Sequence, residues 1–171
     1  CMSLSWAYGV LPTDEDGAKL LHRALDLGYD HLDTARIYGL GHNETLIGKT
    51  LRDNRDKFFL ASKTGIIVDG EKRRIDCKPE TIRKACDESL RLLQTDHIDL
   101  YYLHRRDFET PIEDSVGTLA ELIKEGKIGS IGAGRRDERC SGTEEKALCE
   151  LHEKPPKNDF EKSPVEKRTR P

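Results

Sequence analysis

The stretch Gly28-Tyr29-Asp30-His31-Leu32-Asp33-Thr34 decides the fold, because one helix ends and one strand begins within it. Before it, apolar residues recur at helical spacing from Leu20 to Leu25, behind Thr13, whose side chain is of the kind that caps helices. Gly28 is predicted to end that helix, and Tyr29–Thr34 is predicted to be a strand. A helix followed at once by a strand is the repeating unit of α/β proteins.

The same unit recurs toward the carboxyl end of the chain. Further strands are predicted at Phe58–Ser62, Ile98–Leu103 and Lys127–Ile131, with Cys1–Leu4 as the stump of an earlier one. Further helices are predicted after an Asn43 cap, from Pro79, and over Ile112–Lys124. About five strands alternating with four helices imply right-handed crossovers and a parallel sheet, either as a doubly wound open sheet or as a β/α barrel.

Composition narrows the classes of function. The 171 residues carry a net charge of −3, so no basic excess indicates nucleic-acid binding, and no apolar run is long enough for a membrane span. The five cysteines are odd in number and form no C-x-x-C pair, which is typical of a reducing compartment. We therefore expect a cytoplasmic protein without a metal site.

A change of composition near residue 134 predicts two regions. Residues 135–171 contain 10 Lys or Arg and 9 Asp or Glu in 37 positions, with few apolar side chains. Such a segment buries too little apolar surface to offset the entropy lost on ordering. We expect a folded unit over 1–134 and a charged, disordered tail over 135–171.

Ionisable side chains follow three successive predicted strands. Asp33 ends the first with Tyr38 close behind it, Lys63 ends the second, and His104 ends the third. The carboxyl ends of parallel strands meet at one edge of a sheet, where α/β proteins place their active sites. A tyrosine hydroxyl is a poor acid at neutral pH, and a neighbouring ammonium group favours its ionised form.

This set predicts carbonyl chemistry. Asp33 would hold Lys63 charged and in place, His104 would hydrogen-bond a carbonyl oxygen, and Tyr38 would protonate that oxygen. No side chain can deliver hydride to the carbonyl carbon, so a reduced nicotinamide is implied.

Several spaced motifs resemble those of the aldo-keto reductases, which are NADPH-dependent (β/α)8-barrel enzymes that act on aldehydes and ketones. The motifs, in order, are Cys1-Met2-Ser3 with Ser5-Trp6-Ala7-Tyr8-Gly9, Asp33-Thr34-Ala35 with Tyr38-Gly39, Gly41-His42-Asn43-Glu44, Ala61-Ser62-Lys63, Asp99-Leu100-Tyr101-Tyr102-Leu103-His104-Arg105, and Glu125-Gly126-Lys127-Ile128. The resemblance implies a catalytic tetrad of Asp33, Tyr38, Lys63 and His104, with Tyr38 as proton donor. It also implies cofactor contacts from Met2 and Asp33, and a substrate pocket formed by Trp6, Tyr8, Tyr38 and His104.

The resemblance stops after Ile131-Gly132, where family members continue with three more βα units. We therefore expect a partial TIM-type barrel whose unclosed sheet associates with itself or with another half-barrel. Two alternatives remain open. One is a catalytically incompetent barrel fragment that acts as an interaction or regulatory remnant. The other is a nucleotide-binding open-sheet module, although no phosphate loop fits it.

Overall fold

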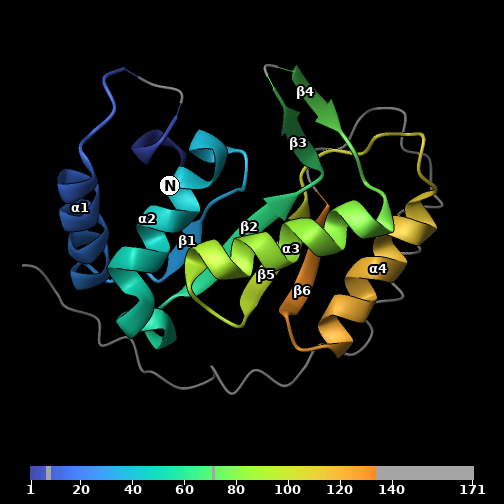
Figure 1. The fold of residues 1–171 in the computed structure, drawn as a ribbon. Helices are drawn as coiled ribbons and strands as arrows, with labels where there is room; N and C mark the ends of the chain where they lie inside the picture. Colours follow the sequence, from blue (N-terminus) through green and yellow to red (C-terminus); the bar gives the residue numbers. More distant parts are fainter. Residues whose placement is uncertain (7–8, 71, 134–171) are drawn as a thin grey trace, which may run out of the picture.

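A parallel four-stranded sheet forms the centre of the computed structural model, which describes residues 1–6, 9–70 and 72–133 (Figure 1). Its strands lie in the spatial order β1-β2-β5-β6. They span His31–Asp33 (β1), Phe59–Thr64 (β2), Ile98–Leu103 (β5) and Ile128–Ala133 (β6). All three pairings are parallel, which confirms the predicted sheet.

Within the described residues, four α-helices connect and cover the strands: α1 (Asp14–Asp26), α2 (His42–Leu51), α3 (Pro79–Leu93) and α4 (Ile112–Lys124). Helices α2, α3 and α4 lie side by side over one face of the sheet, and α1 packs against α2 (Figure 1). The alternation of helix and strand confirms the predicted α/β class and its partial-barrel character. The predicted tail lies outside the described residues.

Local chemistry explains where these helices begin. The Thr13 hydroxyl accepts a hydrogen bond from the Asp16 backbone N–H at 3.2 Å, which confirms the predicted cap of α1. Pro79 occupies the first turn of α3, where its missing N–H has no intrahelical partner to lose. Leu20, predicted to lie on the core face of α1, is exposed instead, because the face of α1 that packs inward carries Gly17, Leu21 and Leu25.

Two predicted features near the amino end are wrong. Met2–Leu4 forms a short 3-10 helix, η1, and no strand, and the amino group of Cys1 donates to the Asp33 backbone oxygen at 2.7 Å. Asn43 does not cap α2, whose N-cap is Gly41 in the left-handed region at φ 94°. The Asn43 amide is buried inside the first turn, where it donates to the Cys1 backbone oxygen at 2.9 Å and accepts from the Thr34 hydroxyl at 2.7 Å. It therefore ties the amino end to the first strand.

An antiparallel hairpin, absent from the predicted elements, follows β2. It consists of β3 (Ile66–Asp69) and β4 (Lys72–Ile75), and it projects beyond the carboxyl ends of the sheet strands (Figure 1). Two short 3-10 helices, η2 (Tyr38–Gly41) and η3 (Arg52–Lys57), flank α2. The hairpin and η2 thus stand at the edge of the sheet where the predicted site residues are expected.

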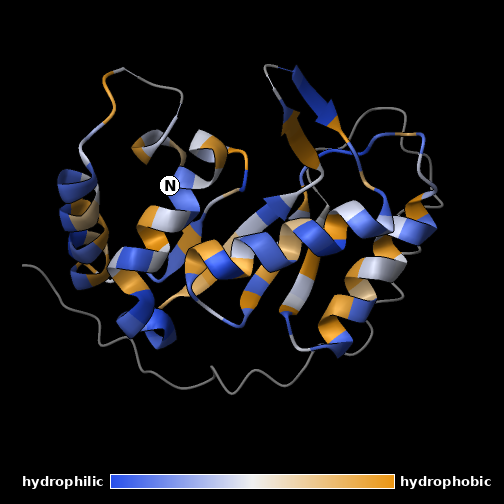
Figure 2. Ribbon diagram, in the orientation of Figure 1, coloured by the Kyte–Doolittle hydropathy of each residue, from blue (hydrophilic) through white to orange (hydrophobic). Residues whose placement is uncertain are grey.

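The two faces of the sheet differ in burial. Side chains that point toward the helices are buried, among them Leu60, Tyr101 and Ile131. Figure 2 shows the matching apolar stripes on the helices, with hydrophilic residues outward. On the opposite face, Ala61, Ile98 and Ile128 are buried as well, whereas Lys63, Leu100 and Tyr102 are partly exposed. We call these the covered face and the open face.

Candidate functional site

Three strand ends and one 3-10 helix position the four predicted catalytic side chains. Asp33 is the last residue of β1, Lys63 lies near the end of β2, and His104 directly follows β5. The His104 backbone N–H donates to the Thr64 oxygen at 2.8 Å, which extends the pairing of β5 with β2. Tyr38 begins η2, immediately beyond β1. The parallel register therefore brings these residues to one edge of the sheet.

Lys63 and Asp33 form a close ion pair. The Lys63 ammonium donates to Asp33 Oδ1 at 2.5 Å and to the Thr34 backbone oxygen at 2.8 Å. The Lys63 side chain is only 14% exposed, whereas that of Asp33 is 47% exposed. The carboxylate and the carbonyl oxygen thus fix the position of a largely enclosed cation.

The Tyr38 ring lies near both the His104 ring and the Lys63 ammonium. The two ring centroids lie 6.2 Å apart in an edge-to-face arrangement, and the Lys63 ammonium lies 5.3 Å from the centroid of the Tyr38 ring. Burial lowers the pKa of His104 below its ordinary value, and the charges of Lys63 and Arg105 act in the same direction. His104 is therefore a neutral imidazole at neutral pH, able to donate one N–H to a neighbouring oxygen.

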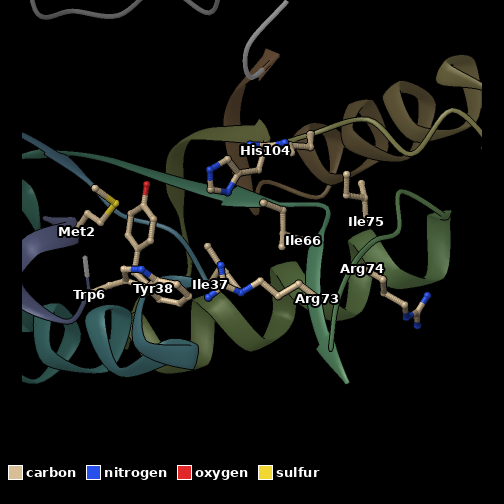
Figure 3. Close-up of a pocket in the computed structure, with 10 residues that line it drawn as sticks. Met2, Trp6, Ile37, Tyr38, Ile66, Arg73, Arg74, Ile75 and His104 are labelled. Carbon is tan, nitrogen blue, oxygen red and sulfur yellow. The ribbon is translucent and has the colours of Figure 1, made fainter. Parts of the chain in front are cut away.

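A cavity of about 350 Å³ opens beside the two rings. Figure 3 shows the Tyr38 hydroxyl and the His104 ring side by side, with Met2 on the far side of the tyrosine. The cavity is lined by Met2, Trp6, Ile37, Tyr38, Ile66, Arg73, Arg74, Ile75, His104 and Arg105. Met2 and Trp6 therefore line the same cavity as Tyr38 and His104, while Tyr8 lies outside the described residues. An apolar wall and a few polar groups are typical of a small-molecule site.

The hairpin supplies lining residues that the sequence analysis missed. Ile66 comes from β3, and Arg73, Arg74 and Ile75 come from β4. The signal for them was Gly70 between an apolar run and a basic run, because Asp69 pairs with Lys72 and Gly70 takes the positive φ, 61°, that opens a tight hairpin turn.

Other site classes find little support in the described part of the chain. Over residues 1–6, 9–70 and 72–133, no cluster of three His, Cys, Asp or Glu side chains could hold a metal ion. Within the same ranges, no helix combines the length and the apolar content that a bilayer crossing requires.

Comparisons with known proteins agree on one family. The family model described as "Aldo/keto reductase family" matches residues 2–153. The curated protein named "Probable aldo-keto reductase 1", from Glycine max, is 40% identical over 134 residues, which are 77% of this chain and 39% of that protein.

Solved structures give the same result. A glycerol dehydrogenase from Gluconobacter oxydans superposes with a TM-score of 0.74 at 34% identity, over 88% of this chain and 46% of that one. An aldo-keto reductase from Bacillus halodurans, in its holo form, superposes with a TM-score of 0.70 at 36% identity, over 78% and 43%. An aldo/keto reductase from Klebsiella pneumoniae, in complex with NADP and acetate, gives 0.66 at 30% identity, over 85% and 47%.

The chain spans less than half the length of each of these relatives. Within that span, the family model covers most of the sequence, and the fold is the partial barrel that the family resemblance implies. The chain belongs to the aldo/keto reductase family.

Proposed function

We propose that this chain carries the proton-donating half of an oxidoreductase site, which reduces an aldehyde or ketone with hydride from NADPH. One observation supports the proposal most: Tyr38 and His104 line one cavity, and the Lys63–Asp33 ion pair lies next to the Tyr38 ring. Each side chain alone has an ordinary structural explanation. Their convergence from separate elements is what a positioned acid–base site requires.

Each of the four residues has a distinct proposed role. Tyr38 donates its hydroxyl proton to the carbonyl oxygen as negative charge develops there. The Lys63 ammonium, 5.3 Å from the Tyr38 ring centroid, stabilises the tyrosinate that remains. Asp33 holds the Lys63 ammonium in place through the 2.5 Å bond, and the neutral His104 ring orients the carbonyl oxygen with an N–H.

The described residues fit the reactive end of a nicotinamide cofactor. The cavity places apolar side chains of Met2 and Ile37 beside the Tyr38 ring, and a flat ring packs well against such a wall. When bound, NADPH supplies the hydride that no side chain can supply. Met2 and Asp33 are the residues proposed to border it. Among the described residues we assign none to the adenosine end.

Cofactor binding and turnover test the proposal separately. We expect the purified chain to bind NADPH saturably, measured by nicotinamide fluorescence, and to oxidise it when butanal is added. Binding that saturates without any oxidation of NADPH would support a cofactor site and contradict the proposed chemistry. A chain with native circular dichroism that neither binds nor oxidises NADPH would overturn the proposal.

A second candidate function rests on the edges of the sheet. Within the described ranges, β1 and β6 each pair on one side only, and the open face is half-buried. Parallel sheets are normally covered on both faces, and unpaired edges recruit other strands. The chain would then act as an interaction module that associates with a second half-barrel. Sedimentation velocity should show a dimer, and a stable compact monomer would contradict this candidate.

A further inference from the structure

Arg73 from the hairpin reaches across the cavity to Trp6. Its guanidinium carbon lies 4.0 Å over the centroid of the Trp6 ring, and Figure 3 shows the side chain extending from β4 toward that ring. A guanidinium group in contact with an aromatic face keeps the N–H donors at its rim available for another partner. The stacking therefore positions Arg73 without using its hydrogen-bonding capacity.

The register of the hairpin explains why Arg73 turns this way. Val68 pairs with Arg73 and Ile66 pairs with Ile75, so these four side chains share one face of the hairpin. Ile66, Arg73 and Ile75 from this face line the cavity, and Arg74 from the opposite face also contributes to its lining. Lys72, the preceding residue, pairs with Asp69 on the opposite face and does not line the cavity.

The cavity carries excess positive charge. Arg73, Arg74 and Arg105 line it, and no acidic side chain among the described residues does. Arg74 is neutralised by Asp76, whose Oδ2 accepts from it at 2.5 Å, and Figure 3 shows its side chain directed away from Trp6. The Lys63 charge is likewise paired with Asp33. For Arg73 and Arg105, no carboxylate partner lies within the described ranges.

We propose that Arg73, with Arg105, selects substrates that carry an anionic oxygen group, a carboxylate or a phosphate, on the chain that bears the carbonyl. This inference rests on the proposed function, because it names the substrate class of that same site. Arginine binds both groups through paired N–H donors, and the bond is stronger than one between neutral groups. The carbonyl would lie at Tyr38 and His104, and the anionic group would lie beneath the hairpin.

Trp6 reports on this site directly, because it is the chain's single tryptophan and contacts Arg73. We would titrate the chain without cofactor, at constant ionic strength, and follow tryptophan fluorescence with butanoate, ethyl phosphate and neutral butan-1-ol. We expect butanoate or ethyl phosphate to bind at least about tenfold more tightly than butan-1-ol. The anion that binds more tightly shows whether the site prefers a carboxylate or a phosphate. Equal affinity for the alcohol and both anions would overturn the proposal.

A matched pair of variants assigns the effect to Arg73. Arg73→Gln should weaken binding of the preferred anion about tenfold, whereas Lys72→Gln removes the same charge from the other face and should change it less than twofold. An equal loss of anion affinity in both variants would mean that the overall surface charge, and not Arg73, determines binding, and it would contradict the proposal. The titration needs neither NADPH nor turnover, so its failure is distinguishable from failure of the reductase activity.

Turnover gives a second, independent measurement. The ratio of kcat/KM for 4-oxobutanoate to that for butanal should exceed ten in the native chain and fall about tenfold in Arg73→Gln. A ratio that Arg73→Gln leaves unchanged would overturn the role of Arg73 in selection.

Discussion

The covered and open faces of the same sheet use their side chains in opposite ways. Toward the helices, Leu60, Tyr101 and Ile131 are nearly fully buried in one apolar layer with α2, α3 and α4. On the open face, Lys63 and Tyr102 are half-buried, and the Lys63 ammonium lies 5.8 Å from the centroid of the Tyr102 ring. Strand β2 therefore contributes Leu60 to the core on one face and Lys63 to the candidate site on the other.

This difference shows how a short strand combines stability with chemistry. Burial of apolar area on the covered face is the main stabilising contribution, because it grows with the area removed from water. The open face instead holds a charge in place through hydrogen bonds. Packing on the open face is tight at Gly132, because a Cβ added there would lie 2.2 Å from the Tyr102 ring. Substitutions on the two faces should therefore affect different measured quantities.

The largest effect on stability is expected at Leu60, which is 1% exposed. Leu60→Ala should lower the free energy of unfolding by about 2–5 kcal/mol, because it removes buried methyl groups and leaves a cavity. Leu100→Ala, on the open face of the neighbouring strand, should cost less than about 2 kcal/mol. Urea unfolding followed by circular dichroism measures both, and equal losses would contradict the division between the faces.

Substitution of Lys63 should lower activity strongly and change stability little. Lys63→Met should reduce turnover of butanal at least ~100-fold, equivalent to about 2.7 kcal/mol in the activation barrier, because the tyrosinate loses its neighbouring cation. The free energy of unfolding should change by less than about 1 kcal/mol, since Asp33 stays partly hydrated. A variant that keeps native turnover, or that unfolds together with its loss of activity, would count against this prediction.

A smaller effect tests the helix layer over the covered face. A Cβ at Gly48 in α2 would lie 2.4 Å from the Leu92 backbone oxygen in α3, so Gly48→Ala should destabilise the fold by about 1–3 kcal/mol. Gly117 in α4 has no neighbour within 4 Å, and Gly117→Ala should stabilise it by about 0.5–1 kcal/mol. Thermal unfolding should show shifts of opposite sign, and shifts of the same sign would refute the assigned packing.

The smallest effect is a pH dependence on the open face. The folded pKa of His104 lies below its ordinary value of 6.5, so the unfolded chain takes up this proton first as the pH falls. His104 therefore makes no contribution above that value, and it lowers stability as the pH falls from there toward the folded pKa. Unfolding measured from pH 8 to 5 should show a steeper decline in the native chain than in His104→Gln. Parallel curves would contradict the assignment.

Regular elements were predictable from sequence because their signals are local. The bounds of α4 and β5 match the predicted ranges, and Pro79 begins α3 as expected. The elements that differ depend on distant contacts. Cys1–Leu4 has the composition of a strand, yet its amino group bonds to Asp33, and Asn43 has the chemistry of a cap, yet it bonds to Cys1 and Thr34. The contacts of Cys1 with Asp33 and Asn43 join residues 32 and 42 positions apart and override such local preferences.

The candidate site likewise contains residues that local sequence signals predict and residues that depend on distant contacts. Asp33, Lys63 and His104 stand at or near strand ends, which apolar runs reveal, so their approach to one edge of the sheet could be predicted from sequence. Arg73 could not be placed from sequence, because its direction depends on the register of a hairpin and on the position of Trp6.

The most direct test of the account is turnover by Tyr38→Phe, compared with Tyr29→Phe. The two variants each remove one hydroxyl, but Tyr38 lines the cavity, whereas Tyr29 is 65% exposed in the turn after α1. We predict that Tyr38→Phe lowers kcat with butanal and NADPH about 10²- to 10⁴-fold while the fold and NADPH binding persist, and that Tyr29→Phe leaves kcat unchanged. Native kcat in Tyr38→Phe would contradict the claim that the open face of this sheet carries a carbonyl-reducing site.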